Sequence, residues 1–294
     1  MSDIARLFND GNCNCKLYAD DVKLFSVLNI DADASFLQDK LNDICNWSRT
    51  WQMNISYKLT KCNVIYVGNT KCSAEMLLDG VMLPVVDKVR DLGVIIDSDL
   101  KFADHINHIV ARAFTRANLI HKCFVSRDAA TLFRAFIVYV RPLLEYASCV
   151  WSPHHIGKIK QIEAVQRNFT KRLPGYSYLH YKERLARLGI DSLEMRRLRH
   201  DLIYCYKVVF GLVDGTCGEM FTLLNSVNNI NTRGHNYKLF PHYCRVDTRK
   251  YFFSERVIDS WNNLPAKTEH FRNLATFKRF ILTVNLTGSV TLGF

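Results

Sequence analysis

The chain has 294 residues, of which 48% are hydrophobic and 12% aromatic. That length and composition exclude a disordered chain and allow a sizeable core in one to three domains. The net charge of +11 is unevenly distributed, because residues 1–100 carry 10 basic and 14 acidic side chains whereas residues 101–200 carry 18 and 7. An acidic first third followed by a basic middle favours metal-dependent chemistry in the first part and contact with phosphates in the second. A solvated basic surface without a partner is the alternative.

The sequence lacks the features of a membrane or secreted protein. Its most apolar stretch, residues 133–151, is interrupted by charged residues and a proline, and its first residues contain no apolar signal region. We therefore expect an intracellular protein, in the nucleus or cytoplasm, with no membrane partner. The ten cysteines are then expected to be reduced and mostly buried, as at Cys45, Cys123, Cys149 and Cys205. An alternative is a zinc site, although the spacing matches none of the usual patterns, at Cys217, His235, His242 and Cys244.

Two adjacent aspartates, Asp20 and Asp21, lie between alternating apolar flanks in residues 17–25. The alternation predicts a tight β-hairpin with both carboxylates at its tip. Like charges at a hairpin tip repel each other and gain little from a core, but they are suited to a divalent cation. Such carboxylate-bound metals serve phosphoryl and nucleotidyl transfer. An ordinary turn is the alternative, because aspartate is a common turn residue.

The rest of the first hundred residues alternates between one helix and several short strands. Apolar spacing predicts a helix over residues 33–51, with Asp33 at the N-cap, that packs behind the hairpin. Strands are expected at residues 63–67, at 76–83 around an Asp79-Gly80 turn, and at 88–97.

After Leu100 the apolar period becomes helical. Helices are predicted from residue 100 to about 120 and over 128–140, 156–173, 193–212 and 274–284, the second ending before Arg141-Pro142. The helices over 156–173 and 193–212 carry basic residues expected on solvated faces: Lys158, Lys160, Arg167, Lys171, Arg172, Arg196, Arg197 and Arg199. These stripes favour contact with a nucleic-acid backbone. A solvated outer face is the alternative.

Several stretches together resemble the reverse transcriptases of non-LTR, LINE-type, jockey-like retrotransposons. The hairpin motif Tyr18-Ala19-Asp20-Asp21 is similar to their catalytic palm motif, and residues 91–97 resemble the strand that leads out of the palm. The remaining stretches resemble their thumb and C-terminal segment: residues 141–146, 150–153, 163–175 and 232–265. The resemblance implies an α+β chain: the C-terminal part of a palm over 1–100, a helical, basic, thumb-like domain over 101–212, and a C-terminal segment over 213–294.

The resemblance also implies residue roles. Asp20 and Asp21 would bind catalytic Mg²⁺ or Mn²⁺, and Tyr18 would lie beside the primer terminus. Lys61 would be the palm lysine that acts as general acid to pyrophosphate, with Lys58 as a competitor for that role. RNA template, RNA–DNA hybrid and dNTPs would be the partners.

The sequence departs from the family pattern before Leu17. The family's earlier palm aspartate, nucleotide-pocket motif and fingers have no counterpart there, and Asp3 and Asp10 match the aspartate by type only. We therefore expect a truncated palm that is inactive alone, with a missing N-terminal half of the polymerase as a further partner. The alternatives are an RNA or hybrid-binding module and a non-functional relic of a truncated element.

Overall fold

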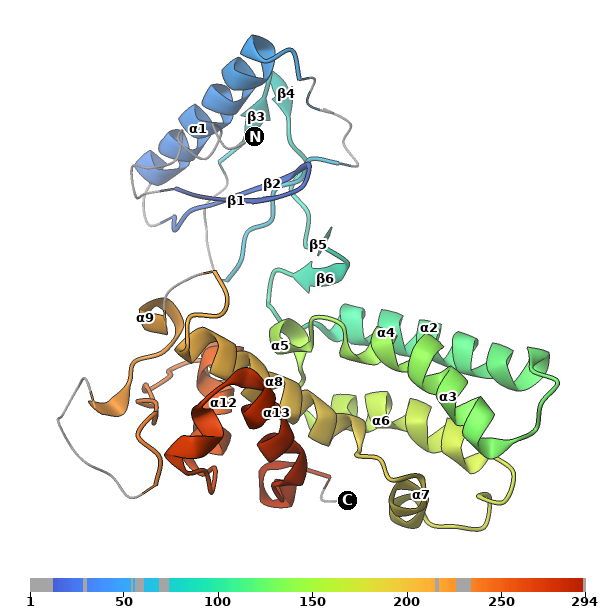
Figure 1. The fold of residues 1–294 in the computed structure, drawn as a ribbon. Coiled ribbons are helices and arrows are strands. Elements are labelled where there is room, and N and C mark those ends of the chain that lie inside the picture. Colours follow the sequence, from blue (N-terminus) through green and yellow to red (C-terminus); the bar gives the residue numbers. More distant parts are fainter. Residues whose placement is uncertain are drawn as a thin grey trace. The chain divides into compact units, whose positions relative to one another are not determined.

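The computed structural model describes residues 13–28, 31–53, 55, 61–68, 74–214, 217–225 and 234–292. The chain forms two compact units, Met1–Leu100 and Lys101–Phe294, each of which is described here by itself. Within the described residues the first unit combines one long helix with small sheets, and the second is helical (Figure 1). Residues 101–212 and 213–294, which the sequence analysis separates, belong to the same unit.

The aspartate hairpin in the first unit forms as predicted. Strands β1 (Asn14–Tyr18) and β2 (Asp21–Phe25) are antiparallel, and Tyr18 pairs with Asp21, which leaves a two-residue turn. Ala19 in that turn has a φ of 52°. One face of the hairpin packs on helix α1 (Asp31–Thr50), in a cluster around Cys13 and Ile44. The predicted packing of this helix behind the hairpin is confirmed, but the helix begins at Asp31, so the expectation that Asp33 is its N-cap is wrong.

The other strands of the first unit are shorter than expected. Strands β3 (Leu77–Leu78) and β4 (Val81–Met82) pair around the predicted Asp79-Gly80 turn. The single strand expected over residues 88–97 is wrong, because β5 (Lys88–Asp91) and β6 (Val94–Asp97) form a hairpin. Its turn consists of Leu92 and Gly93, with φ values of 44° and 86°. Residues 63–67 contribute one isolated bridge, from Val64 to Val85.

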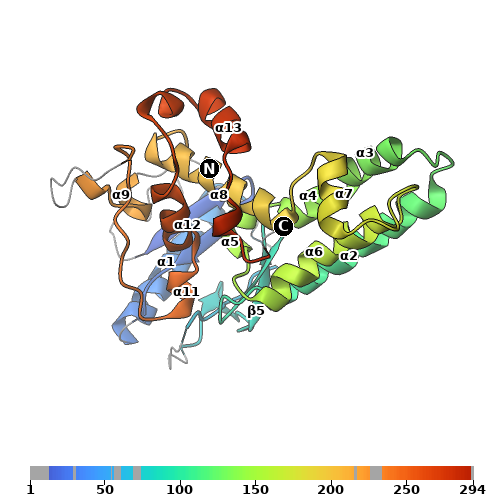
Figure 2. The ribbon, with the colours of Figure 1, turned by 90° about the horizontal axis from the view of Figure 1, so that it is seen from below.

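The second unit begins with a group of packed helices. The predicted apolar face of α2 (Ala103–Cys123) is buried, and α2 packs against α3 (Ala129–Tyr139), α4 (Arg141–Glu145) and α6 (Ile156–Lys171). Figures 1 and 2 show α6 running alongside α2. Asp128 caps α3 by accepting a hydrogen bond of 2.7 Å from the amide of Thr131. Pro142 lies in the first turn of α4, where a missing N–H leaves no hydrogen bond unmade.

Helix α8 (Leu193–Val209) joins these helices to the C-terminal residues. It contacts α4, α5 (Ser148–Trp151) and α6, and it also contacts α12 (Phe253–Asn262) and α13 (Leu274–Thr283), the predicted last helix. Tyr206 of α8 lies in an aromatic core with Trp261, Phe271 and Phe277. This shared core explains why the boundary expected at residue 212 does not separate two units. The remaining short helices are α7 (Tyr181–Leu188), α9 (Cys217–Met220), α11 (Asp247–Lys250), η2 (Thr268–Phe271) and η3 (Thr287–Ser289).

No helix in the described part of the chain is both long and apolar enough to cross a bilayer.

The aromatic core predicts a strong dependence of the second unit on Phe277, which is fully buried. Phe277→Ala should lower the free energy of unfolding by about 3–5 kcal/mol, because it leaves a cavity between Tyr206 and Trp261. Leu282→Ala on the same helix removes a side chain that is 61% exposed and serves as the control. Urea unfolding followed by helical circular dichroism measures both variants, and equal effects would contradict the shared core.

Candidate functional site

The hairpin tip presents two carboxylates to solvent. Asp20 and Asp21 are both exposed, and neither has a hydrogen bond or ion pair among the described residues. Tyr18, opposite Asp21 in the register, is 67% exposed. Nearby, Lys23 of β2 forms an ion pair with Asp91 of β5, which connects the aspartate hairpin to the β5–β6 hairpin. The tip can therefore offer hard oxygen ligands to a cation from solvent.

The described residues contain no further ligand beside this pair. Nowhere in the described part of the chain do three or more His, Cys, Asp or Glu side chains group in a way that could hold a metal ion. Two carboxylates fit one Mg²⁺ that keeps several waters, but not the paired-metal clamp of nucleotidyl transfer. Lys61 is exposed, and among the described residues no hydrogen bond or ion pair joins it to Asp20 or Asp21. Asp3, Asp10 and Lys58 lie outside the described residues.

The alternative zinc site is wrong. The Nε2 atom of His235 lies 2.9 Å from the carbonyl oxygen of Trp261, and its Nδ1 accepts a hydrogen bond from the amide of Tyr237. His242 instead lies 3.3 Å from a carboxylate oxygen of Glu255. All cysteines in the described residues are free thiols. Of those expected to be buried, Cys45 and Cys205 are buried and Cys149 is half-buried, but Cys123 is exposed.

The basic residues of α6 divide into two rows. Lys158 and Arg172 face α2, where Lys158 Nζ donates to Asn107 Oδ1 at 2.8 Å and Arg172 Nη1 donates to Asn118 Oδ1 at 2.6 Å. The second row is spaced by seven and four residues, so it follows one side of the helix: Lys160, Arg167 and Lys171. Lys160 and Lys171 are exposed, and the one acid of α6, Glu163, is fully buried. The exposed surface of α6 is therefore positive without acidic residues.

The arginines expected on a solvated face of α8 are instead engaged inside the unit. Arg197 is 2% exposed, so the expectation that it faces a nucleic acid is wrong. Arg196 forms two hydrogen bonds with Glu145, one of 3.0 Å, and this carboxylate raises the pKa of the Arg196 guanidinium. Arg199 forms an ion pair with Asp191. Helix periodicity identified the polar face of α8 but gave no sign that other elements cover it.

A buried carboxylate connects three helices of the second unit. Glu163 of α6 accepts hydrogen bonds from the hydroxyl of Tyr181 on α7 and from the amides of Leu193 and Glu194 at the start of α8, the latter two at 3.2 and 3.3 Å. Burial raises the pKa of Glu163 although these donors lower it. The Glu163 carboxylate therefore satisfies N–H groups in the first turn of α8 that have no partner within the helix.

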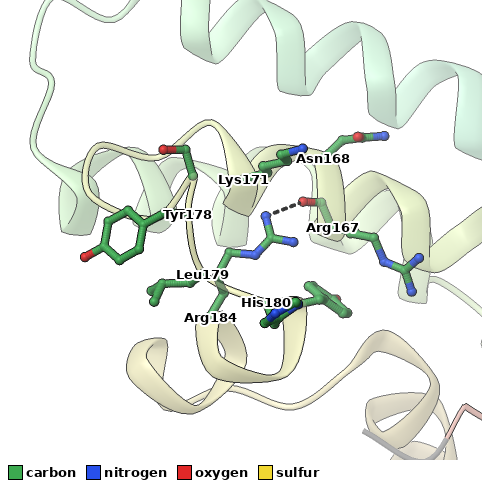
Figure 3. A pocket seen from close by; sticks show the side chains of 9 residues that line it. Arg167, Asn168, Lys171, Tyr178, Leu179, His180 and Arg184 are labelled. Carbon is green, nitrogen blue, oxygen red and sulfur yellow. Dashed lines mark hydrogen bonds between the residues drawn. The ribbon is translucent and has the colours of Figure 1, made fainter.

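A pocket of about 630 Å³, which no sequence pattern predicted, lies beside this network, and we call it the α6–α7 pocket (Figure 3). Its lining comes from α6, the following loop and the start of α7: Arg167, Asn168, Lys171, Ser177, Tyr178, Leu179, His180, Tyr181 and Arg184. Arg167 and Lys171 are among the predicted nucleic-acid contacts. The signal in the sequence was a group of three tyrosines between two groups of basic residues over 171–187, where the one acid is Glu183.

Comparison with known proteins gives relatives but no family model and no solved structure that matches. An RNA-directed DNA polymerase from mobile element jockey of Drosophila funebris is 26% identical over 57% of this chain and 19% of the polymerase. A probable RNA-directed DNA polymerase from transposon BS of Drosophila melanogaster is 24% identical over 64% of this chain and 21% of the polymerase. Over more than half of its length the chain is therefore similar to transposon polymerases. It spans about a fifth of their length.

An uncharacterized protein of Caenorhabditis elegans is also similar, at 28% identity over 42% of this chain and 65% of the nematode protein. The polymerase relatives support the general resemblance to polymerases of transposable elements, among them jockey.

The Glu163 network predicts a pH-dependent effect on stability. Because the pKa of Glu163 is higher in the folded chain than its value of about 4.3 in an unfolded chain, the folded state binds more protons above that pH. The contribution of this group is therefore complete below about pH 4 and is lost as the pH rises. Glu163→Gln should become more stable relative to the unmodified chain between pH 4 and pH 7, as measured by urea unfolding. Glu219→Gln, which changes an exposed glutamate of α9, is the control, and a Glu163→Gln difference that is constant with pH would contradict the account.

Proposed function

We propose that this chain serves as part of an RNA-directed DNA polymerase of a non-LTR retrotransposon, with Asp20 and Asp21 as ligands of Mg²⁺ or Mn²⁺. The observation that carries the proposal is the exposed carboxylate pair at the tip of a hairpin with a two-residue turn, in a chain similar to transposon polymerases. A metal bound there would supply electrostatic stabilisation of phosphate oxygens. Tyr18, on the strand that leads into the turn, would lie beside the end of the primer.

The carboxylate pair does not complete a two-metal site, so the described residues alone are not sufficient for nucleotidyl transfer. Further ligands have to come from residues that the structure does not describe, such as Asp3 or Asp10, or from another polypeptide. Lys61 as general acid is part of the same proposal and requires the same completed site.

In the second unit, we assign contact with the RNA–DNA hybrid to the row Lys160, Arg167 and Lys171 on α6. Lys160 and Lys171 are exposed on a helix whose one acid is buried, which favours attraction of phosphates. Lys158 and Arg172 donate to neutral asparagines on α2, which do not neutralise their positive charge. These two side chains therefore extend the positive surface. This contact also defines the second candidate function, an RNA or hybrid-binding module without catalysis.

The first test of the proposal is metal binding at the hairpin tip together with primer extension. The purified chain should bind Mn²⁺ in an electron paramagnetic resonance titration, and Asp20→Asn/Asp21→Asn should abolish that binding. Asp39→Asn/Asp43→Asn removes the same charge from α1 and should leave binding unchanged. Extension of a DNA primer on an RNA template should be absent with Mg²⁺ or Mn²⁺. Extension that is lost in Asp20→Asn/Asp21→Asn would show a complete metal site, and equal Mn²⁺ binding by all variants would refute the metal assignment.

The second test concerns the basic row of α6. Binding of a labelled RNA–DNA hybrid should weaken with salt, and Lys160→Gln/Lys171→Gln should reduce the slope of log affinity against log salt by about two, one for each lost phosphate contact. Lys278→Gln/Arg279→Gln removes two exposed charges from α13 and is the matched control. A shallow salt response of the unmodified chain, or equal slopes for both variants, would exclude this surface as the contact.

A further inference from the structure

The α6–α7 pocket contains a buried cation that lacks an acidic partner. Arg184 of α7 is 4% exposed, and no carboxylate of the described residues forms an ion pair with it. Its Nη1 donates to the carbonyl oxygen of Arg167 at 3.1 Å, while its buried Nε has no hydrogen-bond partner among the described residues. Burial lowers the pKa of Arg184, and the neighbouring Arg167 lowers it further. Burying a guanidinium without an anion is costly, so the pocket is poised to accept one.

A second guanidinium adds to this positive charge. Arg167 and Arg184 lie over the ring of Tyr181 at 5.1 and 5.3 Å from its centroid. The hydroxyl of Tyr181 donates to Glu163, whose oxygens also accept the two amides of α8. Glu163, the buried acid that Tyr181 contacts, is therefore engaged with other donors. For Arg184 the aromatic ring compensates the charge only in part, because a cation–π contact is weaker than a paired anion.

The N-terminus of α7 does not by itself account for the positive charge of the pocket. Glu183 already caps this helix, because it accepts a hydrogen bond of 2.8 Å from the amide of His180. The positive charge of the pocket thus comes from side chains, and Figure 3 shows Arg184 reaching from α7 toward α6 while Lys171 extends from α6.

An exposed aromatic ring stands at the edge of the same pocket. Tyr178 lines the pocket and is 74% exposed, so most of its ring is open to solvent. Arg187 lies within 3.4 Å of its hydroxyl and stands over the ring of Tyr176 at 4.9 Å. A stacking surface beside a group of cations is the combination by which proteins hold unpaired bases and their phosphates.

We propose that the α6–α7 pocket binds one nucleotide of a single-stranded nucleic acid, with the phosphate at Arg184 and Lys171 and the base stacked on Tyr178. The proposal rests on the proposed contact of α6 with nucleic acid and adds a preference for unpaired strands. A duplex keeps its bases stacked inside and can offer only phosphates to this surface, so it cannot use Tyr178. The row that ends at Lys171 begins at Lys160, along which the neighbouring phosphates of the strand would lie.

The test is fluorescence anisotropy with short labelled strands and the full chain. Tyr178→Ala should weaken binding of an unpaired oligouridylate about tenfold, whereas Tyr178→Phe should bind normally because stacking requires the ring and not the hydroxyl. Tyr243→Ala, at a tyrosine that is 91% exposed outside the pocket, is the matched control. Tyr178 is exposed, so its replacement avoids the folding defect expected when the buried Arg184 is removed. Oligothymidylate in a parallel titration distinguishes RNA from DNA as the strand.

An abasic strand of the same length separates base stacking from phosphate binding. It should bind as weakly to the unmodified chain as oligouridylate binds to Tyr178→Ala. Equal binding of abasic and normal strands, or competition by inorganic phosphate alone that removes all binding, would reduce the pocket to a phosphate site and overturn the proposal. An unchanged affinity of Tyr178→Ala would overturn it too. If the hybrid still bound with a steep salt dependence in that case, the proposed function would stand without the pocket.

Discussion

The second unit depends on one buried carboxylate. Glu163 accepts a hydrogen bond from Tyr181 of α7 and two from the amides that begin α8, so three helices meet at a single side chain. A buried carboxylate is costly unless its oxygens are satisfied, and here they receive donors from a hydroxyl and from a helix N-terminus. By fixing the ring of Tyr181, the same carboxylate sets where Arg167 and Arg184 stand. The positive charge of the α6–α7 pocket is therefore a consequence of how these helices pack.

The same packing decides which basic residues remain available to a partner. Arg197 is enclosed in the unit, and Arg196 and Arg199 are paired with Glu145 and Asp191. The ion pairs of Arg196 and Arg199 join α8 to its neighbours, and the carboxylates largely neutralise these two charges. Exposed Lys160 and Lys171, in contrast, have no acid beside them on α6. The basic residues of the middle of the chain thus have two different physical roles, structural cohesion in α8 and attraction of anions on α6.

Local patterns in the sequence were sufficient to predict the aspartate hairpin, the helix behind it and the apolar face of α2, because each depends on neighbours within a few residues. They failed where distant segments decide. The turn at Leu92 and Gly93 was missed because Leu92 is a poor residue for a positive φ, so the stretch reads as one apolar strand. The burial of Arg197 depends on what packs around α8, which no helical period reveals. The α6–α7 pocket was missed because its residues come from two helices and a loop, although the tyrosines between two groups of basic residues over 171–187 were visible.

The two proposed sites differ in how much structure each requires. A two-metal site needs all of its carboxylates within a few ångströms of one another. The two carboxylates of a hairpin tip are not enough, because a partial set of ligands does not give a proportional part of the activity. Contact with a nucleic-acid backbone is the sum of separate phosphate interactions, each of which adds to affinity by itself. The proposed contacts of the basic row on α6 and of the Tyr178 ring would therefore add to affinity even without the further metal ligands that the described residues lack. Of the two proposed functions, binding therefore requires less of the structure, and catalysis requires ligands beyond the described hairpin.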